Sequence, residues 1–117
     1  MSIKQKYLII PSVPTPNGRL HLGHIGGPFL TADVLARALK RQGHEVKMCC
    51  GTDSYESFVL REAAKKNQSA EEICHHYHGQ IAKDLKRMAI DIDTFINPLS
   101  DDCHQRYVNW QYTIFSK

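Results

Sequence analysis

Short continuous apolar runs mark the expected strands of this chain. Residues 7–10 are apolar and lead into Pro11-Ser12-Val13, which predicts a strand that is buried on both faces, as in a parallel sheet. Residues 45–50 predict a second short strand, and Gly51-Thr52-Asp53 ends it. Residues 94–96 predict a third.

Between the first two strands, the apolar positions change to helical spacing. Residues 24–42 carry basic side chains in the last turns, and Gly43 stands at the expected C′ position. The apolar positions of this expected helix are Leu30, Val34, Leu35, Ala38 and Leu39. A strand, a helix and a strand with short joints predict a right-handed βαβ unit.

Helical patterns dominate the later part of the chain. We expect a helix from about Ser54 to Lys66, and then a capping box of Ser69 and Glu72 that opens a helix to about Ala89. The apolar stripe of this second helix is formed by Ile73, Tyr77, Ile81, Leu85 and Met88. Residues 100–102 open a last helix. Its apolar face is expected to pack in the core and consists of Cys103, Tyr107, Trp110 and Ile114.

These elements predict an α/β fold with a Rossmann-like, doubly wound parallel sheet. A sheet of two or three strands is small, because typical sheets have about four to six. We therefore expect residues 1–117 to form the N-terminal half of a nucleotide-binding domain, a β-α-β unit followed by helices, with no second domain.

Composition narrows the class of protein only slightly. The 117 residues are 42% hydrophobic and 23% charged, which is ordinary for one globular domain. The formal charge of +3 allows an anionic ligand but is too small to indicate nucleic-acid binding. No run is long enough for a signal peptide or a membrane span, so we expect a cytoplasmic protein that does not engage a membrane. Without CxxC spacing, the cysteines are expected to be reduced thiols in the core: Cys49, Cys50, Cys74 and Cys103.

The first candidate site is the turn between the first strand and the first helix. Residues 14–20 form a Pro/Gly-rich segment, and His21-Leu22-Gly23-His24 follows where the first free N–H groups of a helix are expected. Such a helix end attracts phosphate, imidazoles add hydrogen bonds to a charged oxygen, and Gly23 removes a side chain that would keep a ligand away. This turn therefore predicts a nucleotide site, although a surface turn with two histidines is the alternative.

Gly51-Thr52-Asp53 is the second candidate, because ligands of open α/β sheets bind beyond the carboxyl ends of the strands. The Asp53 carboxylate would hold a substrate ammonium group. Alternatively, it would cap the next helix by accepting the N–H groups of Tyr55 or Glu56.

A third cluster runs from Cys74 to His78. Cys74 and His78 have the i,i+4 spacing of a shared metal ligand pair, but no second pair has the usual zinc spacing, so we favour a solvated helix face and no metal site. For Tyr107 and Trp110, core packing is favoured over base stacking.

Together, the motifs resemble the N-terminal part of the class I aminoacyl-tRNA synthetases, and most closely the methionyl-tRNA synthetase family. The family signature is His-Ile/Leu-Gly-His after a Pro-x-x-Asn-Gly turn. The matching residues are Pro14, Asn17, Gly18, His21, Leu22, Gly23 and His24. The resemblance continues through residues 32–37, 41–46 and 51–53, and more weakly through the helix ending near residue 89 and residues 92–95.

This resemblance implies an enzyme that uses ATP, with Mg²⁺, to activate an amino acid, expected to be methionine. The substrate carboxylate attacks the α-phosphate, giving an aminoacyl-adenylate and pyrophosphate, and the aminoacyl group passes to tRNA. By resemblance, His21 and His24 are catalytic, Gly23 lets adenine lie close, Asp53 binds the ammonium group and Val13 contacts the amino acid. The residues implied to bind ATP are Pro14, Asn17, Gly18, His21, Gly23 and His24.

The chain contains no Lys-Met-Ser-Lys-Ser loop, so we expect it to be inactive in isolation and to meet tRNA only within a longer chain or a complex. One alternative is a truncated, inactive synthetase paralogue that acts as a binding module with a partner chain or as a homo-oligomer. Another is a small cytidylyl- or adenylyltransferase, a class that shares the His-x-Gly-His turn but lacks the segments at 32–37 and 51–53.

Overall fold

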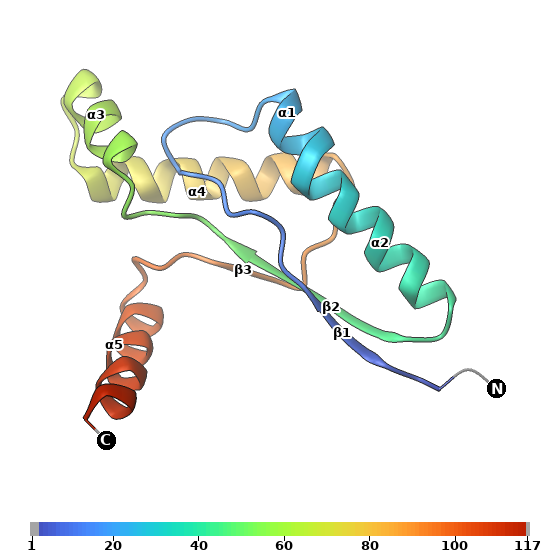
Figure 1. Cartoon of the computed structure of the whole chain (residues 1–117). Coiled ribbons are helices and arrows are strands. Elements are labelled where there is room, and N and C mark those ends of the chain that lie inside the picture. Colours follow the sequence, from blue (N-terminus) through green and yellow to red (C-terminus); the bar gives the residue numbers. More distant parts are fainter. Residues whose placement is uncertain (1–2, 117) are drawn as a thin grey trace.

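A three-stranded parallel sheet lies at the centre of the computed structural model, which describes residues 3–116 (Figure 1). The spatial order is β1 (Lys6–Ile9), β2 (Glu45–Gly51) and β3 (Thr94–Ile96). Lys6 lies opposite Glu45, and Gly51 lies opposite Ile96. The expected strands and the βαβ unit are therefore confirmed, with β1 and β3 as the two edges of this sheet.

Helices connect and follow these strands. The segment between β1 and β2 is one continuous helical stretch made of α1 (Leu22–His24), the π-helical turn η1 (Ile25–Phe29) and α2 (Leu30–Arg41). The later helices are α3 (Ser57–Lys66), α4 (Ala70–Arg87) and α5 (Asp101–Phe115). The capping box of Ser69 and Glu72 is confirmed at the start of α4. Helix α3 begins three residues later than expected, with Glu56 at its N-cap.

The main core lies on one face of the sheet. Along β2, Val46, Met48 and Cys50 are buried while Lys47 is exposed, and both α2 and α4 pack against this face. The buried members of this core are Phe29, Ala32, Met48, Cys50, Ile81, Leu85 and Ile90. The expectation that the first strand is buried on both faces is wrong, because α2 and α4 cover the same side.

Helix α2 faces the core with side chains other than those the apolar pattern indicated. Its buried residues are Ala32, Asp33 and Ala36, preceded by Phe29, whereas the expected stripe is largely exposed. The exposed members are Leu30, Val34, Leu35 and Ala38. Small side chains let the helix lie close to β2, and Asp33 tolerates burial because Arg37 donates to its carboxylate at 2.6 Å.

Helix α5 stands apart from the sheet and the other helices (Figure 1). Tyr107 and Trp110 are 53% and 59% exposed, so their expected packing in the core is wrong. The molecule is accordingly flat, with extents of 58 × 44 × 18 Å and a radius of gyration of 16.6 Å. A compact domain of this length has a radius of gyration of about 13 Å. The sequence pattern of α5 is amphipathic, but nothing in the described part of the chain covers the apolar face of this helix.

Helix ends agree with the sequence expectations, and the cysteines agree with them in part. Gly43 has φ +88°, and the hydrogen bonds from Gly43 N to Lys40 O and from His44 N to Leu39 O complete a Schellman motif after α2. The four cysteines are free, and Cys50 and Cys74 are buried, whereas Cys49 and Cys103 are only half-buried, so their expected place in the core is wrong. Within residues 3–116, none of the helices combines the length and apolar character that crossing a membrane requires.

Candidate functional site

Reciprocal capping by two histidines begins the first helix. His21 has an extended backbone (φ −101°, ψ 171°), and its Nδ1 accepts the N–H groups of Gly23 at 3.1 Å and His24 at 3.4 Å. In return, His24 Nδ1 accepts the N–H of His21 at 3.3 Å. The two rings stack with centroids 3.7 Å apart and an angle of 24° between their planes. This capping box fixes both imidazoles at the start of α1.

The capping bonds determine where each ring carries its proton. Because both Nδ1 atoms accept hydrogen bonds, the network assigns the proton of each neutral ring to Nε2. Burial, followed by the effect of the neighbouring His21, lowers the pKa of His24, which favours the neutral form of this ring. The N–H groups of Gly23 and His24, which were expected to be free, are capped by His21. Two imidazole Nε2–H donors are therefore what this turn offers to an anion.

Gly23 gives the capping ring its space. A Cβ at this position would lie 3.0 Å from His21 Cε1 and 3.1 Å from His21 Nδ1. The helix then widens into η1, where Pro28 has no N–H to donate and Leu30 N–H bonds to the carbonyls of Gly27 and Ile25. π turns are frequent at functional sites, and this one follows directly after the two histidines.

Asp53 lies beyond the carboxyl end of β2, beside the chain that leaves β1. Its N–H donates to the Pro14 carbonyl at 2.9 Å, which brings Val13 and Pro14 to the same edge of the sheet. The Asp53 side chain is half-buried and Val13 is 47% exposed. Asp53 does not cap α3, because Glu56 occupies that N-cap. The alternative role of Asp53 as the cap of the next helix is therefore wrong.

The turn between Pro14 and the histidines is compact. Pro14 and Pro16 are buried, and Asn17 N–H donates to the Thr15 carbonyl at 2.9 Å. Asn17 and Gly18 are half-buried. The sequence-predicted residues thus form two groups: the histidines with Gly23 at the helix start, and Asp53 with Val13 and Pro14 at the sheet edge.

Helix α4 contacts a neighbour of each group, through Asp84, which no motif singled out, and through His78, which the sequence analysis considered only as a metal ligand. Asp84 is 8% exposed and accepts two hydrogen bonds from Arg19, one from Nη2 and one from Nε at 3.0 Å. These bonds lower the pKa of Asp84. His78 Nδ1 lies 3.0 Å from Thr52 Oγ1, and its ring stacks on Phe95 with centroids 4.7 Å apart. The available sequence signals were a carboxylate within an apolar stripe and a histidine one turn after Cys74.

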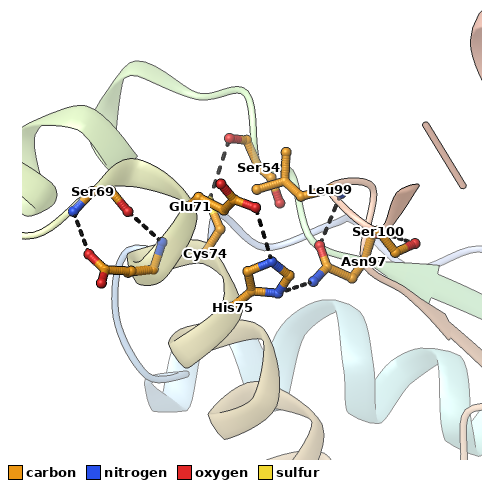
Figure 2. Close-up of polar contacts among 9 residues, drawn as sticks. Ser54, Ser69, Glu71, Cys74, His75, Asn97, Leu99 and Ser100 are labelled. Atoms are coloured by element: carbon orange, nitrogen blue, oxygen red, sulfur yellow. Dashed lines mark hydrogen bonds and ion pairs between the residues drawn. The ribbon is translucent and has the colours of Figure 1, made fainter. Parts of the chain in front are cut away.

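The side chains of the Cys74–His78 segment contact separate neighbours. The Cys74 thiol is buried and donates to the Ser54 carbonyl at 3.7 Å, while His75 lies on the other side, between Glu71 and Asn97 (Figure 2). Burial raises the pKa of Cys74. The expected solvated face holds for His75 and His76 but is wrong for Cys74 and His78. Among residues 3–116, His, Cys, Asp and Glu side chains form no group of three or more that could hold a metal ion.

Three hollows on the surface lie elsewhere, with volumes of about 530, 590 and 600 Å³. Each is lined by residues other than His21, His24 and Asp53. The residues of the candidate site are held in place by hydrogen bonds to His21, His24 and Pro14.

A parallel sheet with capped histidines at its first strand-to-helix turn defines a Rossmann-like nucleotide-binding architecture. The family model described as "tRNA synthetases class I (M)" matches residues 7–116. This chain belongs to that family. It resembles the N-terminal catalytic part of methionyl-tRNA synthetases, as the motifs indicated.

Individual relatives agree with this assignment. Methionine–tRNA ligase of Thermococcus kodakarensis is 34% identical over 90 residues, which cover 77% of this chain and 12% of the relative. The Parabacteroides distasonis enzyme is 30% identical over 113 residues, covering 97% and 17%. A solved structure of Mycobacterium tuberculosis methionyl-tRNA synthetase in complex with methionyl-adenylate superposes with a TM-score of 0.78 at 22% identity, covering 88% of this chain and 20% of that one. The chain thus spans 12 to 17% of these curated relatives.

Proposed function

We propose that this chain supplies the ATP-binding and amino-acid-binding half of a class I synthetase catalytic domain, which forms methionyl-adenylate from methionine and ATP for transfer to tRNA. The observation that carries the proposal is the reciprocal cap of His21 and His24, which leaves two Nε2–H donors at one helix start. The similar proteins are named as methionine–tRNA ligases and as a methionyl-adenylate complex, and both names fit this assignment.

In this proposal, the two histidines act on the phosphates of ATP. Their Nε2–H groups would donate to phosphate oxygens and stabilise the charge that develops as the methionine carboxylate attacks the α-phosphate. His21 and His24 are already fixed by their caps, so little reorganisation is needed when charge develops. The Pro14–Gly18 turn would border the nucleotide and would contact it through Pro14, Asn17 and Gly18.

Asp53 would hold the ammonium group of the amino acid. Its N–H bond to Pro14 fixes the backbone next to Val13, which would contact the substrate side chain. Binding both substrates at adjacent strand ends converts the reaction into one between positioned groups. Mg²⁺ would enter the site with the triphosphate of ATP.

In this proposal, residues 1–117 form one half of a larger catalytic domain that works in the cytoplasm. In the common doubly wound order, the first strand is central and pairs with strands on both sides. Here β1 is an edge, which fits a sheet that continues beyond β1. Its Leu8 is 63% exposed, which fits a sheet face that further helices would cover. tRNA would be met by the complete protein.

A second candidate is an inactive synthetase-like binding module that pairs with a partner chain or with itself. The observation that favours it is the exposed apolar face of α5, where Tyr107, Trp110 and Ile114 are 53%, 59% and 48% exposed. Apolar surface of this extent is typical of interaction sites.

Calorimetric titration with non-hydrolysable aminoacyl-adenylate analogues distinguishes the candidates. We expect the methionyl analogue to bind more tightly than a panel of other analogues, and Asp53→Asn to weaken it about tenfold or more, as for a lost charge-assisted hydrogen bond. Asp102→Asn, on the exposed start of α5, is the matched control. Absence of binding in a folded chain, together with self-association, would favour the binding module instead.

A further inference from the structure

Helix α4 holds both parts of the candidate site through two different side chains. Asp84 binds Arg19, which lies two residues before His21. His78 binds Thr52, which directly precedes Asp53. We propose that Asp84 and His78 are positioning residues: the Asp84–Arg19 pair sets the phosphate side of the site, and the His78–Thr52 pair sets the amino-acid side. This inference rests on the proposed function.

The Asp84–Arg19 contact has the geometry of a specific anchor. The guanidinium Nε and Nη2 atoms donate to separate oxygens of one carboxylate, which fixes the direction of the Arg19 side chain as well as its position. The Asp84 side chain is 11% exposed and that of Arg19 57%, so the carboxylate is the buried, fixed partner. The contact joins residues 65 positions apart and attaches the Pro/Gly-rich turn to the C-terminal part of α4.

The His78–Thr52 contact fixes the other part. The His78 ring is half-buried and stacks on Phe95 at an angle of 23° between the planes. Thr52 is buried, and its N–H donates to the Ile96 carbonyl at 3.3 Å. Thr52 is therefore held by β3 through its backbone and by α4 through its hydroxyl. The N–H of the next residue, Asp53, donates to the Pro14 carbonyl. The backbone that carries the Asp53 carboxylate is therefore restrained by Thr52 on one side and by Pro14 on the other.

The consequence is a division of labour along α4: one of its side chains supports the phosphate side of the site and the other supports the amino-acid side. His78 and Asp84 lie six residues apart on α4, and this helix is continuous over that span. Because each contact reaches a different part of the site, breaking one should impair one substrate and spare the other. A residue that only stabilised the fold would affect both substrates alike.

Paired titrations of the full chain test this division, with methionine and a non-hydrolysable ATP analogue as probes. Thr52→Val and His78→Phe, which keeps the stacked ring, should weaken methionine about fivefold to tenfold, the effect of one hydrogen bond. They should change ATP-analogue affinity less than about twofold, a difference below that expected for one hydrogen bond. Arg19→Gln should do the reverse. Thr52→Ser, which restores a hydroxyl, should recover methionine binding.

Exposed residues of the same helix provide the controls. His76→Phe changes a ring without a contact to Thr52, and Lys83→Gln changes a charge beside Asp84; both should bind the two probes as the unmodified chain does. If Thr52→Val and Arg19→Gln weaken both probes equally, or neither, while the unmodified chain binds them, the division of labour is wrong.

Amide hydrogen exchange keeps the inference separate from the proposed function. If the unmodified chain binds neither probe, the proposed function fails for this chain, and the exchange rates then decide. His78→Phe should accelerate exchange of the Asp53 N–H but not of the Gly23 N–H, and Arg19→Gln should do the opposite. Unchanged exchange at both amides would overturn the positioning roles.

Discussion

His21 and His24 cap each other: each Nδ1 accepts a backbone N–H from the other residue, and the rings stack 3.7 Å apart. Capping and ligand binding therefore use different atoms of the same side chains. The Nδ1 atoms stabilise the helix start, while the Nε2 atoms are left for the ligand that we propose.

This division of atoms makes His24→Asn informative. The Asn Oδ1 can take the place of Nδ1 in the cap, but the variant has no equivalent of Nε2–H. We expect affinity for a non-hydrolysable ATP analogue to fall about tenfold or more, as for a hydrogen bond to a charged group, with thermal stability nearly unchanged. Calorimetry and a melting curve measure the two effects. His24→Ala, which loses the cap as well, should also lower stability by about 1 kcal/mol.

Histidine burial predicts the pH dependence of stability. The pKa values of His24 and His78 are lowered, in each case chiefly by burial. The unfolded chain, with pKa values near 6.5, therefore binds more protons than the folded one just below that pH. Stability from these groups is fully present above about pH 7 and declines as pH falls through about 6.5. Urea unfolding at pH 7.5 and 5.5 should show the loss, and His24→Asn with His78→Asn should reduce it. An equal loss in the double variant would contradict this explanation.

Two helix ends with left-handed backbone should respond oppositely to substitution. Gly43 has φ +88° after α2, whereas Ala89 has φ 55° after α4. We expect Gly43→Ala to destabilise the chain and Ala89→Gly to stabilise it, each by about 1 kcal/mol, because a Cβ is strained in this region. Denaturant unfolding measures the change in the free energy of unfolding for each variant. Changes of the same sign would contradict the left-handed backbone at these two positions.

Gly51 joins β2 to β3 at very short range. A Cβ at Gly51 would lie 2.5 Å from the Ile96 carbonyl oxygen. This oxygen belongs to the backbone of the paired strand, so it cannot move aside as the end of a flexible side chain could. Gly51→Ala should cost about 1–3 kcal/mol, typical of overpacking. Gly79→Ala is the control: Gly79 lies inside α4, and a Cβ there would have open space around it, so alanine should add about 1 kcal/mol of helix stability. Equal stability of Gly51→Ala and the parent chain would contradict the close approach.

Local signals in the sequence were sufficient for most element boundaries. The Ser69–Glu72 capping box and the Gly43 end depend on side chains within a few residues of each other, and the structure has both. The sequence predicts the start of α3 at Ser54, but the helix begins at Ser57. The Asp53 N–H donates to the Pro14 carbonyl, and this bond keeps the chain out of the helix just after β2. That bond joins residues far apart in the chain, and no local pattern encodes it.

Burial was harder to predict than secondary structure. An apolar stripe shows which helix face prefers burial, but the partner decides which face is covered. Ala36 is buried on α2 although Leu35 is more apolar, and Trp110 on α5 is exposed. For the candidate site, the motifs predict His21, His24 and Asp53, whereas the Arg19–Asp84 contact spans 65 positions and could only be found in the fold.

The most direct test of the central claim is the protonation of the two imidazoles. Nitrogen-15 NMR of the histidine rings should show the Nδ1 atoms of His21 and His24 as hydrogen-bond acceptors and the ring proton of the neutral tautomer on Nε2. Titration with a non-hydrolysable ATP analogue should then shift both Nε2–H signals while the Nδ1 signals stay nearly fixed. Protons on Nδ1, or Nε2 signals that do not respond to a ligand shown to bind, would contradict a phosphate site built on this reciprocal cap.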